Sequence, residues 1–354
     1  MEEKKDTLGM LDLVIRPGFC VKENQIIKVN QAAESLFITP GTDVRPLLLT
    51  GSEEYAAFTG GCLYLTLNLS SHSCGASVTR VEDTDVFLLE QESDNGELRS
   101  MALAARELRE PLTNVMITAD SLFPLCATEE SPRTAEQVAR LNRGLFQILR
   151  IIGNMSDAER CAAVSHQETV DIPALFAEFF EKAETLISHT GITLTYEGPN
   201  QPIYGLADRE QLERAVLNIL SNAIKFTPKG GTVTAKLTRS GRMLRLSVTD
   251  SGSGIAQSVR SSVFSRYLRQ PVLEDSRYGI GLGMVLIRTA AAHHGGAVLI
   301  DQPDGAGTRI TMTMAIRQSK QATLRSNVLR VDYAGERDHG LIELSECLPT
   351  ELYE

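Results

Sequence analysis

Two asparagines and a lysine are spaced so that one face of a single helix would carry all three. Asn218 and Asn222 lie four residues apart in an apolar helical stretch, and Lys225 follows on the same side. Neutral carboxamide oxygens suit Mg²⁺, which bridges to phosphates, and the lysine would meet phosphate charge. Asparagine is a mediocre helix former, so the presence of two asparagines in this helix calls for a functional explanation. The alternative is two solvated asparagines on an exposed face.

A carboxylate and two glycines follow a predicted strand, in the motif Asp250, Gly252, Gly254 and Ile255. Glycines at such a point adopt positive φ and let the backbone approach a ligand closely. A single buried carboxylate would accept a hydrogen bond from the adenine amino group and would repel the carbonyl oxygen of guanine. An isolated pattern of this kind is more often a simple strand-to-loop turn.

A third motif, Gly279, Gly281, Leu282 and Gly283, opens a later helix. Backbone N–H groups at a helix start form a site for anions such as phosphates, although a lone glycine motif is a weak signal. Arginines in the intervening loop would reach a triphosphate, and aromatic residues would anchor the loop unless they are ordinary core residues. These residues are Arg260, Arg266, Arg269, Arg277, Phe264 and Tyr267.

Hydrophobic periodicity predicts the elements that precede these motifs. Within residues 10–90, the runs Gly61–Ser70, Ala76–Glu82 and Asp85–Glu90 read as strands of an antiparallel sheet. Residues 96–161 carry two helical stripes, separated by a proline-containing turn at Phe123–Arg133, and predict an antiparallel hairpin. A lone hairpin cannot bury both stripes, so a dimeric four-helix bundle is expected.

Residues 168–316 alternate between helix and strand, which predicts a two-layer α/β sandwich. The expected helices are Pro173–Ile187, Asp208–Phe226 and Gly283–His294, and the expected strands are Ile192–Tyr196, Thr232–Thr238, Leu244–Asp250 and Thr308–Ile316. The predicted fold class is α+β and multidomain.

Composition argues against several classes of protein. The net charge of −10 argues against a general nucleic-acid binder, which needs a basic surface. Apolar runs stay below the roughly 18 residues of a membrane span, and the first residues do not read as a secretion signal. The six cysteines form no C-x-x-C pair. We therefore expect a cytoplasmic protein without a membrane partner.

The order of these motifs resembles the ATP-binding domain of sensor histidine kinases, which is of the Bergerat or GHKL type. Leu217–Gly231 resembles its N box, Asp250–Ile255 its G1 box, Val263–Arg266 its F box and Gly279–Gly283 its G2 box. The resemblance implies ATP and Mg²⁺ as cofactors, with Asn218 and Asn222 on the metal. It assigns ATP to Asn218, Asn222, Lys225, Asp250, Gly252, Gly254, Ile255, Arg266, Gly279, Gly281, Leu282, Gly283 and Thr308.

The family's hydrolytic relatives carry a water-activating glutamate where this chain has Asn218. The site therefore resembles one that holds ATP for transfer to another group, because no base for hydrolysis is evident.

The first hairpin helix resembles the phosphoacceptor segment of the same kinases, whose usual form is S-H-E-L-R-T-P-L. Pro111 keeps its place and is expected to bend the helix, but Arg106 stands at the histidine position and Glu110 at the threonine position. A guanidinium stays protonated to above about pH 12 and is no nucleophile, so Glu107 has nothing to activate. The sequence predicts ATP binding without self-phosphorylation.

Glu23–Phe37 resembles the opening of a PAS sensory domain, a hairpin strand that ends in asparagine before a short helix. The expected domains are a PAS-like domain at 1–95, the hairpin at 96–165, the ATP-binding domain at 166–317 and an extension at 318–354. Within the extension we expect a strand at Asp332-Tyr333 and a short helix at His339–Leu344.

The preferred hypothesis is a homodimeric, pseudokinase-like regulator in two-component-type signalling. Its expected partner is a response regulator or another histidine kinase. The alternatives are an active kinase that phosphorylates a partner in trans and a nucleotide-independent dimerisation scaffold.

Overall fold

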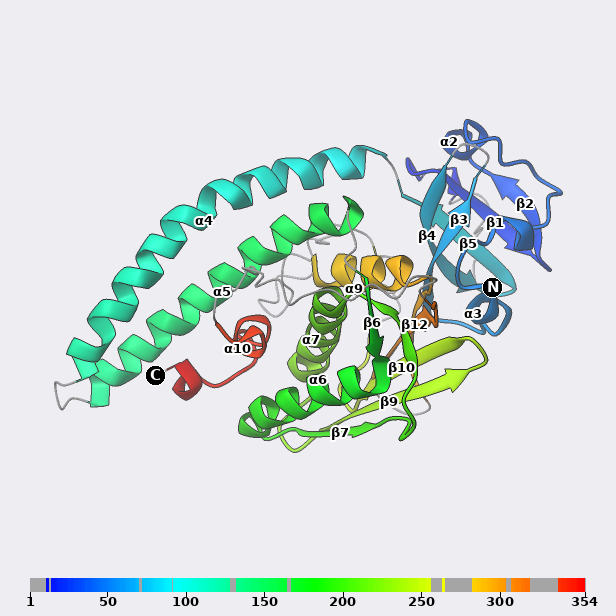
Figure 1. The fold of residues 1–354 in the computed structure, drawn as a ribbon. Coiled ribbons are helices and arrows are strands. Elements are labelled where there is room, and N and C mark those ends of the chain that lie inside the picture. The colour runs from blue at the N-terminus through cyan, green and yellow to red at the C-terminus, as the bar shows by residue number, and fades with distance from the viewer. Residues whose placement is uncertain are drawn as a thin grey trace, which may run out of the picture.

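The computed structural model describes residues 11–12, 14–69, 72–90, 92–127, 132–163, 167–255, 263–264, 282–303, 307–318 and 337–353. The architecture is mixed α+β: a large sheet, helices packed on it, and a long helical hairpin that extends to one side (Figure 1). Among the helices of these ranges, none combines the length and apolar character needed to cross a lipid bilayer.

The N-terminal part contains five antiparallel strands: β1 (Gly18–Lys22), β2 (Gln25–Val29), β3 (Cys62–Asn68), β4 (Ser73–Val81) and β5 (Thr84–Leu89). The short helices α2 (Gln31–Glu34), η1 (Arg45–Leu47) and α3 (Ser52–Ala56) connect β2 to β3. Burial alternates along β5, as expected for a sheet with one covered face. The three strands predicted here are confirmed.

Asn30 shows why the chain turns after β2. Its Oδ1 accepts the N–H groups of Ala33 and Gly18, both at 3.0 Å, and its Nδ2 donates to the carbonyls of Val14 and Arg16. One buried side chain thus caps α2 and ties it to the strand beside it. The strand–asparagine–helix order read from the sequence is confirmed, while the PAS assignment stays a prediction.

The hairpin consists of α4 (Glu92–Ala127) and α5 (Pro132–Ala163), which pack against each other along their length. Helix α4 continues through Pro111 and is curved in Figure 1. The predicted stripes divide between two environments. Leu112 and Leu145 are buried within the chain, whereas Leu108 and Val115 are exposed by about half.

The C-terminal part contains the helices α6 (Ile172–Ile187), α7 (Arg209–Phe226) and α9 (Leu282–His293), with a 3-10 turn η2 (Ser188–Thr190). Its strands are β6 (Glu168–Asp171), β7 (Thr193–Glu197), β8 (Tyr204–Ala207), β9 (Thr232–Ser240), β10 (Met243–Asp250), β11 (Val298–Asp301) and β12 (Arg309–Ala315). The elements predicted from the sequence are confirmed, and β6, β8 and β11 were missed.

The two parts share one sheet. Strand β3 pairs antiparallel with β11, so the order β2-β1-β5-β4-β3-β11-β12-β10-β9-β7 is continuous, and only β6 and β8 pair separately among the described strands. At this joint Arg288 of α9 lies 4.9 Å from the ring centre of Tyr64 and forms an ion pair with Glu90. The sequence did not reveal this joint, because β11 was not predicted and β3 read as an ordinary strand.

Residues 337–353, which we call the C-terminal segment, contain α10 (His339–Glu343) and a 3-10 turn η3 (Thr350–Tyr353). The segment lies between α5 and the α6–α7 pair (Figure 1). The predicted short helix is confirmed. The strand expected at Asp332-Tyr333 falls outside the described residues.

Candidate functional site

Helix α7 is fixed at its start by two residues that the sequence places far apart. Asp208 caps it by accepting the Gln211 N–H at 3.2 Å. The Asp208 N–H in turn donates to Nε2 of His294, whose Nδ1 contacts the Ala290 carbonyl at 2.7 Å. These two contacts require a neutral ring with the proton on Nδ1, and burial accordingly lowers the pKa of His294.

Asn218 is almost completely buried on α7, with 1% of its surface exposed. Its Nδ2 donates to the Arg214 carbonyl at 2.9 Å and to the Glu343 carboxylate at 3.3 Å. Its Oδ1 is buried and has no hydrogen-bond partner within the described part of the chain. The solvated alternative is therefore wrong for Asn218, and its orphaned oxygen is the kind of group that a missing ligand satisfies.

Asn222 lies one turn further along and is half-buried, with Nδ2 at 3.8 Å from the sulfur of Met284 on α9. Gly283, at the start of α9, faces Asn218 so closely that a Cβ there would lie 2.7 Å from Asn218 Oδ1. Leu282 beside it is buried. The asparagine pair and the end of the third motif thus come together, as the sequence predicted.

Asp250 ends β10 with 7% of its surface exposed. Its Oδ1 accepts the N–H groups of Gly252 at 2.9 Å and Thr308 at 3.1 Å. Burial raises the pKa of Asp250, although those two hydrogen bonds favour the charged form. Gly254 adopts a φ of +75°, the left-handed conformation expected of the motif. One buried carboxylate therefore stands where the adenine-reading group was predicted.

Lys225 is half-buried and forms an ion pair with Glu346 of the C-terminal segment. Burial alone would raise the pKa of Glu346, but Arg150 and Lys225 hold it below its ordinary value. The sequence had placed Lys225 toward phosphate and gave no sign of this pairing.

Several predicted residues lie outside the described ranges, namely Arg260, Arg266, Arg269, Arg277, Tyr267, Gly279 and Gly281. Phe264 is described and is buried, and its carbonyl accepts a hydrogen bond from Arg288 at 3.2 Å. On the hairpin, the side chains of Arg106, Glu107 and Glu110 are all exposed on α4.

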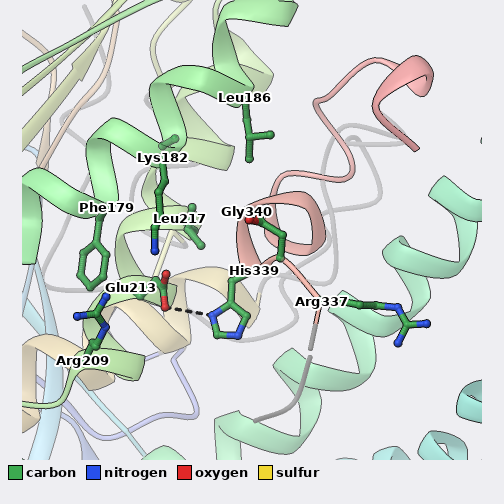
Figure 2. A pocket seen from close by; sticks show the side chains of 11 residues that line it. Phe179, Lys182, Leu186, Arg209, Glu213, Leu217, Arg337, His339 and Gly340 are labelled. Carbon is green, nitrogen blue, oxygen red and sulfur yellow. Dashed lines mark hydrogen bonds and ion pairs between the residues drawn. The ribbon is translucent and has the colours of Figure 1, made fainter. Parts of the chain in front are cut away.

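A separate cavity of about 260 Å³ lies between α6, α7 and the start of α10 (Figure 2). Its walls include Lys182, Arg209, Leu217 and His339, and an ion pair of 3.0 Å joins His339 to Glu213. None of the ATP-site residues predicted from the sequence lines this cavity. The cavity therefore belongs to the contact between α10 and the helices α6 and α7.

Residues 207–318 match the family described as histidine kinase-, DNA gyrase B- and HSP90-like ATPases. They are a domain of that family. The matched range contains the whole asparagine, Asp250 and Gly283 arrangement. This ATPase-family domain implies ATP binding. The α+β fold class and the GHKL-type ATP-binding domain recognised from the sequence are confirmed.

Relatives agree with this assignment. An uncharacterised sensor-like histidine kinase of Rhizobium meliloti is 29% identical over 73% of this chain and 52% of its own length. The adaptive-response sensory kinase SasA of Crocosphaera subtropica is 27% identical over 61% of this chain and 58% of its own. The chain thus spans about half the length of these curated relatives.

Among solved structures, full-length ShkA in complex with AMPPNP is 24% identical, with a TM-score of 0.50. The similarity covers 62% of this chain and 46% of ShkA and shows the shared fold.

The contact between Gly283 and Asn218 gives a test of how the ATPase-family domain is packed. We expect Gly283→Ala to lower the free energy of unfolding by about 1–3 kcal/mol, because the new methyl group meets the Asn218 amide. Gly144→Ala on α5, where the added Cβ meets nothing, is the control and should stabilise by about 0.5–1 kcal/mol. Denaturant titration measures both, and effects of equal sign would contradict the packing.

Proposed function

We propose that the chain is an ATP-binding histidine-kinase homologue in two-component-type signalling whose own hairpin does not become phosphorylated. The proposal rests on the buried Oδ1 of Asn218, which faces Gly283 in a domain of the ATPase family and has no hydrogen-bond partner within the described ranges. A buried amide oxygen without a partner costs about 1–3 kcal/mol, which a bound ligand would recover.

Magnesium fits this site. Asn218 and Asn222 would hold the ion, since a carboxamide oxygen is a hard, neutral ligand and the Asn218 oxygen is already desolvated. When bound, the ion supplies positive charge that orients the phosphates of ATP. Asp250 would read adenine at the other end, and its two backbone hydrogen bonds fix the direction of the carboxylate.

The hairpin supports the loss of self-phosphorylation. Arg106 is exposed on α4 at the acceptor position, so access is not what prevents the reaction. The obstacle is chemical, because a protonated guanidinium offers no lone pair to the γ-phosphate. In this proposal the binding of ATP changes the conformation of the chain. The chain then acts on a response regulator or on another histidine kinase.

The hairpin also supports a homodimer. Leu108 and Val115 are 50% and 52% exposed, and Leu141 and Ile148 are 54% and 47% exposed. Each pair is seven residues apart, so the exposed apolar side chains form one stripe on each helix. A second hairpin would bury both stripes in a four-helix bundle.

We expect Asp250→Asn to weaken the binding of Mg-AMPPNP at least about tenfold, because an amide in that position offers adenine a weaker acceptor than a carboxylate. Affinity in the original chain should fall on acidification, since Asp250 must be ionised. Burial raises the pKa of Asp250, so the fall begins at a higher pH than for an exposed aspartate. Calorimetric titration measures both effects. Asp83→Asn, at an exposed turn, is the control, and equal affinities in all three chains would refute the role of Asp250.

We expect γ-labelled ATP to leave no acid-labile label on the original chain and to label Arg106→His, because the variant restores an imidazole nucleophile. Arg106→Gln is the matched control and should stay unlabelled. Stable acid-labile label on the original chain would overturn this part of the proposal. Label that appears only on an added partner protein would favour the alternative of a kinase acting in trans.

We expect light scattering to find a dimer of the full chain and the double variant Leu108→Lys, Val115→Lys to be monomeric, because two charges would have to be buried at the bundle seam. Ile117 lies on another face of α4 and is 60% exposed, so the control variant Ile117→Lys should remain dimeric. A monomeric original chain would exclude the bundle.

A further inference from the structure

The C-terminal segment docks against the hairpin through its backbone carbonyls. Nε of Arg143 donates to the Ser345 carbonyl at 2.9 Å, and Nδ2 of Asn142 donates to the Tyr353 carbonyl at 2.8 Å. The ring of Tyr353 meets that of Phe146 edge-on at 5.2 Å. The segment is therefore specifically seated on α5, although the chain in between runs through residues that are not described.

Two carboxylates of the segment contact cations of both the hairpin and the ATP-binding domain. Glu343 is completely buried, with its oxygens 3.1 Å from Nε of Arg214 and 3.3 Å from Nε of Arg150. Glu346 pairs with Arg150 at 3.0 Å and with Lys225. The two acids thus neutralise three cations on α5 and α7.

The same carboxylates touch residues that the proposed function gives to ATP. Glu343 accepts from the Asn218 amide, and Glu346 holds the Lys225 ammonium. The phosphates of ATP carry the same sign of charge as these carboxylates. Within a few ångströms of shared cations, like charges in a buried setting repel strongly, so both sets cannot be held at once.

We propose that the C-terminal segment is an intramolecular inhibitor that competes with the phosphates of ATP for Lys225, which Glu346 now neutralises. The inference rests on the proposed ATP binding and adds its regulation. Because the competition is reciprocal, ATP lowers the occupancy of the docked segment by the same factor by which the segment lowers the affinity for ATP.

The seat of the segment suits reversible docking. A cavity of about 260 Å³ lies under the start of α10, so part of that end lacks packing partners, and His339 there forms an ion pair with Glu213 (Figure 2). Buried ion pairs add little net stability, because desolvation offsets their attraction. Phosphates would replace the carboxylates that leave, so the cations would keep anionic partners.

Release would also loosen the ATP-binding domain from the hairpin. Glu343 bridges Arg150 of α5 and Arg214 of α7, and Glu346 bridges Arg150 and Lys225. The docked C-terminal segment therefore holds α5 and α7 together. Nucleotide binding that displaces the segment would change how the two helices are held.

The test is the affinity of the full chain for Mg-AMPPNP, measured by calorimetry. We expect the charge-reversal variant Glu343→Lys, Glu346→Lys to bind at least about tenfold more tightly, because apparent affinity is reduced by the fraction of molecules in the competent state. Glu351→Lys, an exposed glutamate of the same segment, is the matched control and should bind like the original chain.

Equal affinity in all three chains would overturn the inference and leave ATP binding intact. Weaker binding by the double variant would also overturn it, since the carboxylates would then support the metal. Failure of all three to bind millimolar nucleotide would instead refute the proposed function on which the inference rests.

Hydrogen exchange on the unmodified chain keeps the inference testable if the double variant does not fold. We expect saturating Mg-AMPPNP to raise exchange in residues 337–353. Unchanged protection of those amides while nucleotide is bound would contradict the competition.

Discussion

Helix α7 is enclosed by β10, α6, α9 and α10, and this enclosure imposes the constraint that shapes the rest of the site. A polar group removed from water must find a partner or bear a cost of about 1–3 kcal/mol. Gln211 contacts His293, and Arg214 donates to Glu343 and Asn154, whereas the Oδ1 of Asn218 has no hydrogen-bond partner among the residues that the structure describes. This oxygen belongs to the residue to which the family resemblance assigns the metal.

The shared sheet puts the N-terminal part in direct contact with the same region. Strand β3 continues the sheet through β11, and Tyr64 on β3 packs against Phe264 with ring centres 5.6 Å apart. Arg288 of α9 sits over Tyr64, forms an ion pair with Glu90 and bonds the Phe264 carbonyl. The N-terminal sheet thus contacts α9, and Gly283 at the start of α9 contacts Asn218.

The sequence predicted features that depend on nearby residues better than contacts between residues far apart in the chain. Long elements with clear periodicity, such as α7 and β10, were found because their patterns are local. The four-residue strands β6, β8 and β11 were missed because so few residues carry no period. The proximity of Asn218 and Gly283 was predictable because the order of the motifs indicates which distant residues come together. The burial of Glu343 was not, because a glutamate in a polar tail reads as solvated until Arg150 and Arg214, 193 and 129 residues away, are placed beside it.

Arg106 at the acceptor position and the docked C-terminal segment both concern what ATP binding would accomplish in this chain. In our proposal, arginine at position 106 offers the γ-phosphate no nucleophile on α4, so the free energy of ATP binding would drive a rearrangement of the chain. Glu343 and Glu346 link the cations of α5 and α7. In the inference above, phosphates compete with Glu346 for Lys225. A ligand shifts a conformational equilibrium by its difference in affinity for the two states. In the inference above, Glu346 neutralises Lys225 in the docked state, and the phosphates of ATP neutralise it in the other.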